Sequence, residues 1–130
     1  MPIAFDILDE TTSGECRDAG RFTSESSATT LREMIRLRVR QEVDRFNHSE
    51  CPVFQGLIQP EETERILNGA RPTHRPLDWE KQYARAIGAF QGNGFLVLVD
   101  DRQITGLDET IHLEPQTRIT FLKLVPLIGG

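Results

Sequence analysis

Cysteine and long apolar runs are both scarce in this chain. Its two cysteines, Cys16 and Cys51, are far apart and belong to no CxxC or Cys/His pattern, which predicts reduced thiols rather than a disulfide or a metal site. No apolar run approaches the roughly 18 residues that cross a bilayer, and no charged segment followed by an apolar stretch opens the chain. We therefore expect no membrane partner, no export and a cytoplasmic location.

Basic residues are also fewer than acidic residues. The chain has 15 basic and 20 acidic residues, for a net charge of -5, and such a balance disfavours binding to nucleic-acid backbones. Of the basic residues only Lys81 and Lys123 are lysines. The length of 130 residues and the 38% hydrophobic content are typical of one globular domain spanning residues 1–130.

The N-terminal part predicts a hairpin followed by a helix. Apolar and polar residues alternate from Ile3 to Ile7, residues 11–14 can form a turn, and a polar strand returns over 15–23 at a sheet edge. Thr30 and Glu33 form a capping box before a helix that runs to Phe46. Its buried face is predicted to consist of apolar residues at three- and four-residue intervals: Leu31, Met34, Ile35, Val39, Val43 and Phe46.

A basic row lies beside this apolar stripe. Arg32, Arg36 and Arg40 follow each other at i, i+4 spacing. Such a row is either a solvated helix face or a surface that binds a partner.

Residues 48–93 have the composition of a helical insertion. Prolines and glycines interrupt this stretch, and one short helix is predicted from Pro60 through Leu67. Asp78 can cap a second helix that Asn93 and Gly94 end. The stripe of that second helix is interpreted as core packing rather than as a ligand site, and consists of Trp79, Tyr83, Ala86, Ile87 and Phe90.

Several strands are predicted to follow the insertion. Phe95–Val99 has no alternation, which indicates a central strand, and residues 100–103 form a tight connection to a returning segment at 104–107. A short strand at 110–113 and a last strand from Arg118 to Val125 come next. This order predicts an α+β domain with a helix laid across a mixed sheet.

The last predicted strand is more apolar than one buried face requires. Ile119 and Phe121 face one side, whereas Thr120, Leu122 and Leu124 face the other. Excess apolar surface of this kind is typical of a docking site. Leu122 and Leu124, together with Leu127 and Ile128, are therefore the candidate partner-binding residues.

A diglycine follows the last strand. Pro126 prevents further ladder pairing at its own nitrogen, so residues 126–130 are expected to form a flexible tail that ends in Gly129 and Gly130. Glycine has no Cβ, so a partner can close over such a tail and reach its carboxylate. The same residues are also compatible with a disordered end that has no role.

The order of elements and this tail resemble the β-grasp family of ubiquitin-like proteins and sulfur carriers. The matching segments are the hairpin, the helix, FLVLVDDRQI and ITFLKLVPLIGG, over about two thirds of the chain. The segments FLVLVDDRQI and ITFLKLVPLIGG are similar to the corresponding part of the small subunit of molybdopterin synthase and of the thiamine sulfur carrier. Residues 48–93 depart from the family pattern, because the usual family member has no such insertion between its helix and its third strand. That departure looks more like the ubiquitin-like proteins encoded with bacterial antiviral conjugation systems.

The resemblance implies that this chain is a substrate and not an enzyme. Gly130 would be adenylated by an activating enzyme, passed through thioesters to a conjugating enzyme, and joined to amines of target proteins, with a metal-dependent isopeptidase as a further partner. No cofactor is implied. Lys81 and Lys123 would be the only side-chain acceptors for chains. The alternative from the same family is a sulfur carrier, in which Gly130 bears a thiocarboxylate.

Two other classes of function are alternatives: an enzyme and a non-covalent interaction module. Enzyme candidates are weak, because His48 with Cys51 has no surrounding motif and neither His74 nor His112 has a carboxylate partner in the sequence. Asp100 and Asp101 are more typical of a turn than of a metal site. A non-covalent interaction module stays open, and deletion of Gly129 and Gly130 would distinguish it from a modifier or carrier.

Overall fold

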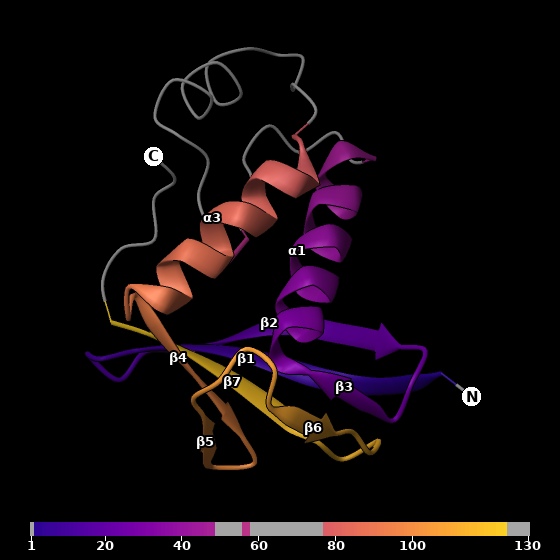
Figure 1. Cartoon of the computed structure of the whole chain (residues 1–130), viewed down its shortest axis with the longest axis vertical. Helices are drawn as coiled ribbons and strands as arrows, with labels where there is room; N and C mark the ends of the chain where they lie inside the picture. Colours follow the sequence, from indigo (N-terminus) through magenta and orange to yellow (C-terminus); the bar gives the residue numbers. More distant parts are fainter. Residues whose placement is uncertain (1, 49–55, 58–76, 125–130) are drawn as a thin grey trace.

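A five-stranded mixed sheet carries two helices on one side (Figure 1). The computed structural model describes residues 2–48, 56–57 and 77–124. The sheet order is β2-β1-β7-β4-β5, and β3 pairs with β6 in a separate ribbon. The elements are β1 (Ile3–Thr11), β2 (Cys16–Ser24), β3 (Ala28–Thr30), α1 (Leu31–Asn47), α3 (Trp79–Gln91), β4 (Phe95–Val99), β5 (Arg102–Ile104), β6 (Thr110–His112) and β7 (Arg118–Lys123). The predicted α+β class is confirmed.

The predicted hairpin and its edge position are both confirmed. β1 pairs with β2 antiparallel, and β2 has no neighbour on its other side among the described residues. Gly14 in the turn has a φ of +94°, a backbone conformation that glycine adopts without steric cost. The register shifts between Ile7 and Leu8, where Gly20 lies opposite with a φ of +117°. Such a bulge increases the local twist of the sheet edge.

Helix α1 begins where the capping box predicts. Thr30 is the N-cap, and its side chain accepts a hydrogen bond from the Glu33 backbone N–H at 3.2 Å. The predicted apolar stripe lies against the sheet, and all its residues are buried. Strand β3, directly before the helix, was not predicted, because three residues are too few to show a periodic pattern.

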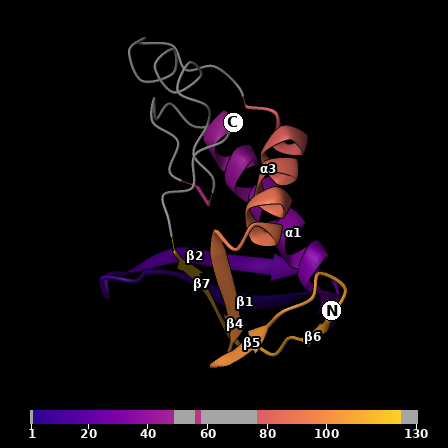
Figure 2. The same cartoon turned by 60° about the vertical axis from the view of Figure 1, so that its left-hand side comes forward.

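Helix α3 lies beside α1 over the same sheet face, as both views show (Figures 1 and 2). Asp78 caps it by accepting from Glu80 N–H at 3.0 Å, and Asn93 follows its end with a φ of +60°. Its apolar residues pack on the core, with Ala86 fully buried. The core-packing interpretation is thus confirmed. The other predicted helix of the insertion, Pro60–Leu67, lies outside the described residues.

Strand β7 lies in the centre of the sheet. It pairs parallel with β1 and antiparallel with β4, and β4 pairs in turn with β5. The predicted interior position of β4 is therefore confirmed. β7 ends at Lys123, and Leu124 still donates its backbone N–H to the Gly94 carbonyl at 2.9 Å. The position predicted as the strand's last, Val125, lies outside the described residues.

The connection from β4 to β5 is shorter than predicted. Asp100 and Asp101 have φ values of +49° and +75°, so these two residues complete the turn and Arg102 already pairs with Val99. The returning strand is Arg102–Ile104, not 104–107 as the sequence suggested. Two consecutive residues with positive φ match the twist of a hairpin, which explains why the connection needs no more residues.

Candidate functional site

The two faces of the sheet differ in what covers them. Phe5, Val97 and Phe121 point toward the helices and are fully buried. The residues that alternate with these side chains point to the opposite face, which α1 and α3 leave open in both views (Figures 1 and 2). This face is where a partner could reach the sheet.

Four leucines gather on the open face. They are half-buried, and none is among the residues packed against the core. Leu96 lies directly opposite Leu122, and Thr120 lies between Leu98 and Leu8. We call this set the leucine patch: Leu8, Leu96, Leu98 and Leu122. An apolar cluster on a sheet face that the described helices leave open is the kind of surface that protein partners bind.

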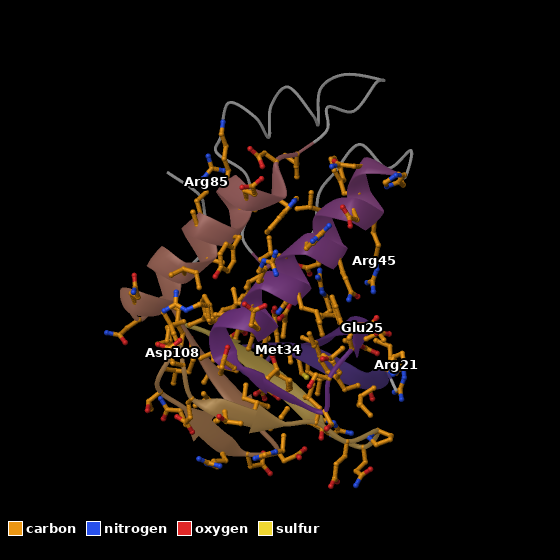
Figure 3. All side chains as sticks on the ribbon, turned by 45° about the vertical axis from the view of Figure 1, so that its right-hand side comes forward. Arg21, Glu25, Met34, Arg45, Arg85 and Asp108 are labelled. Carbon is orange, nitrogen blue, oxygen red and sulfur yellow. The ribbon has the colours of Figure 1, made fainter. Side chains whose placement is uncertain are left out.

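Charged side chains lie beside the leucine patch. Asp6, two residues before Leu8, pairs with Arg21 on the edge strand at 2.9 Å, and both side chains are about half exposed. Figure 3 shows Arg21 at the outer edge of the molecule, far from Asp108. Arg118 lies opposite Asp6 in the register of β1 and β7 and is exposed. The apolar centre with charged neighbours resembles the anatomy of a protein interface.

The predicted partner-binding residues fall in two groups. Leu122 lies in the leucine patch, and Leu124 follows β7 directly and is half-buried. Leu127 and Ile128 lie outside the described residues, as do the predicted activation residues Gly129 and Gly130. Of the predicted partner surface, the structure therefore describes the part on β7 and directly after it, up to Leu124.

The sequence interpretation missed three members of the patch. Leu96 and Leu98 belong to the non-alternating FLVLV run, which predicts a central strand but does not by itself assign the extra apolar residues to a face. Leu8 continues the alternation of β1 and faces outward as Asp6 does, but it is a large apolar residue at an outward position. The signal was present in the run itself, because a strand covered on one face needs only every second residue to be apolar.

A buried charge cluster lies on the covered side of the sheet. The Arg38 guanidinium donates to both carboxylate oxygens of Asp9 at 2.7 Å and to Glu42 at 3.2 Å. Arg38 is fully buried, and its guanidinium stacks on the Phe121 ring at 4.6 Å. Glu42 in turn accepts the backbone N–H of Leu57 at 3.0 Å. The cluster thus joins β1, α1, β7 and the described residues 56–57.

Burial and pairing oppose each other at this cluster. Burial raises the pKa of the Asp9 carboxyl. The hydrogen bond and charge of Arg38, together with the charges of Lys123 and Arg17, lower it by more than burial raises it, so the pKa of Asp9 lies below its ordinary value. Burial lowers the pKa of Arg38, and the carboxylates of Glu42 and Asp9 more than reverse this effect. Pairing therefore favours the charged forms of Asp9 and Arg38, and the Arg38 guanidinium is held by hydrogen bonds to two carboxylates.

The predicted basic row is a surface feature that contacts α3. The Arg36 and Arg40 guanidinium groups lie over the Trp79 ring at 5.3 and 5.2 Å. Arg32 pairs with Asp108 at 3.3 Å, and both side chains are well exposed. Helix packing accounts for two of the three arginines, so the row does not by itself indicate a partner site.

The enzyme candidates that the structure describes lie on separate elements. The His48 ring contacts the Asp44 carbonyl at the end of α1, and His112 is exposed on β6. Cys16 is an exposed free thiol, whereas Cys51 and His74 lie outside the described residues. Within residues 2–48, 56–57 and 77–124, no three His, Cys, Asp or Glu side chains are grouped to hold a metal ion. Asp100 and Asp101 act in a turn, as predicted.

Comparison with protein-family models, with curated proteins and with solved structures gives no significant match. Among the described helices, none is long and apolar enough to cross a membrane.

Proposed function

We propose that this chain is a ubiquitin-like protein modifier. In this proposal Gly130 is the acyl group that becomes attached to target amines, and the leucine patch is the surface that the activating and conjugating enzymes recognise. The chain is a substrate for those enzymes and supplies no catalytic residue. A role in bacterial antiviral defence follows only from the resemblance of the sequence.

The sheet order is the observation that carries the proposal. A first hairpin, a helix across the sheet, and a last strand inserted between the first strand and β4 are compatible with a β-grasp fold. This arrangement places β7 in the centre of the sheet. A tail that follows a central strand starts from a rigid base, which suits a residue that must be presented to another enzyme.

In the proposed reaction the chain supplies a carboxylate and a docking surface, and the partner enzymes supply the catalytic groups. The Gly130 carboxylate attacks the α-phosphorus of a nucleoside triphosphate, and pyrophosphate leaves. A cysteine thiolate of the activating enzyme then displaces the nucleotide monophosphate, which gives a thioester. After exchange onto the conjugating enzyme, a target amine forms the C–N bond while the C–S bond breaks and the thiolate leaves. Each step needs a docking surface and an accessible tail, and the leucine patch meets the first need.

Intact mass spectrometry tests the proposal. The full chain, tagged at its N-terminus, is expressed in its native cells with and without the genes that flank its own, beside a variant that lacks Gly129 and Gly130. We expect higher-mass species joined through Gly130 to an amine, and none from the deletion variant.

Two other results would contradict the proposal. A mass increase equal to the replacement of oxygen by sulfur at Gly130, without conjugates, would indicate the sulfur carrier. An unchanged mass under every condition would indicate a non-covalent interaction module.

A further inference from the structure

The two lysine side chains of this protein lie in very different surroundings. Lys81 is in the first turn of α3 and is exposed. Among the described residues, none forms an ion pair or hydrogen bond with its ammonium group. Ala84 and Gly88, on the same side of the helix at i+3 and i+7, are also exposed, and space is open beside the Gly88 Cα. A bulky acyl donor could therefore approach Lys81 without displacing any side chain among residues 2–48, 56–57 and 77–124.

Lys123 is held within the molecule. Its Nζ lies 3.7 Å from an Asp9 carboxylate oxygen, and only 24% of its side chain is exposed. It extends from β7 to the covered side of the sheet, since Asp9 belongs to the buried cluster with Arg38. Burial lowers the pKa of Lys123, and the Asp9 carboxylate opposes this effect. Acylation would remove the positive charge beside Asp9 and would place an acyl group in a packed region.

We infer that Lys81 is the side chain at which this protein accepts an acyl group from a second, activated copy of itself, and that Lys123 is excluded. The neutral Lys81 amine attacks the thioester carbonyl at Gly130 of the donor copy. The C–N bond forms, the amine proton passes to water, and the C–S bond breaks with the thiolate as leaving group. The donor in this step depends on the proposed function, whereas the contrast between the two amines does not.

Chemical acetylation tests that contrast without any partner enzyme. The folded full chain is treated with a limiting amount of an N-hydroxysuccinimide acetate, and the acetylated peptides are quantified at successive times. We expect Lys81 to be acetylated several times faster than Lys123, and the two rates to converge in denaturant. A folded protein in which Lys123 reacts as fast as Lys81 would overturn the inference.

Linkage mapping tests the acceptor itself. Wild type, Lys81→Arg and Lys123→Arg are compared under conditions that produce Gly130-linked conjugates. We expect self-linked species to be lost in Lys81→Arg and retained in Lys123→Arg. Two results would overturn this inference alone, provided that Gly130-linked conjugates on other proteins are present. In the first, self-linked species persist in Lys81→Arg. In the second, self-linked species never form in wild type. The absence of every Gly130 conjugate in wild type would overturn the proposed function and the self-linkage together.

Discussion

The covered and open faces of the sheet both carry large apolar residues but differ in how deeply these residues are buried. On the covered face, Phe5, Val97 and Phe121 are fully buried under the helices, and one hydrogen-bonded cluster around Arg38 joins four segments. On the open face, the leucine patch is only half-buried and is not packed on the core. The covered face therefore contributes most to stability, and the apolar surface of the open face is available for a partner.

Removal of Arg38 should have the largest effect on stability. Arg38→Ala leaves the Asp9 and Glu42 carboxylates buried without their cation, which costs about 3–5 kcal/mol of unfolding free energy in comparable cases. Arg40→Ala, on the exposed side of the same helix, is the matched control and should change stability by under about 1 kcal/mol. Urea unfolding followed by circular dichroism measures both. Equal effects of the two variants would contradict the assignment of Arg38 to a buried cluster.

Two neighbours on β4 compare the faces directly. Val97→Ala removes apolar volume from the fully buried side and should cost about 2 kcal/mol. Leu98→Ser changes the leucine patch and should stay within about 1 kcal/mol of wild type. Thermal and urea unfolding of the two variants give the comparison. A larger loss for Leu98→Ser would mean that the open face is part of the core.

A smaller effect is expected from pH. Because the pKa of Asp9 is lower in the folded state than its ordinary value, its contribution to stability is complete above about pH 4, the unfolded value. That contribution is lost as the pH falls through the lower folded value. The stability difference between wild type and Asp9→Asn should therefore shrink in acid. A difference that stays constant from neutral pH down to about pH 2, well below that unfolded value, would show that the carboxylate charge is not responsible.

Much of the fold could be predicted from local patterns. The hairpin, the Thr30 cap, the apolar stripe of α1 and the Asp78 cap are all encoded by neighbouring residues, and the structure confirms them. Strand β3 and the early start of β5 could not be predicted. The first depends on pairing with β6, far along the chain, and the second on positive φ at Asp100 and Asp101.

The candidate site was predictable only in part. Leu122 could be assigned to an outward face, because its strand alternates clearly, but its contact with Leu96 depends on the order of strands in the sheet. The buried cluster was missed for a similar reason. Arg38 and Glu42 lie at i, i+4 on the stripe that also carries Met34 and Val39, where a charged residue is buried only if a partner such as Asp9 meets it from another element.

Conjugate yield from the two β4 variants tests the division between the faces most directly. The full chain carrying Leu98→Ser or Val97→Ala is expressed under conjugating conditions at a temperature at which both are folded, and Gly130-linked species are quantified by mass spectrometry. The account predicts a several-fold loss of conjugates for the stable Leu98→Ser variant and near wild-type yield for the less stable Val97→Ala. Wild-type yield from Leu98→Ser, with a loss confined to Val97→Ala, would contradict it.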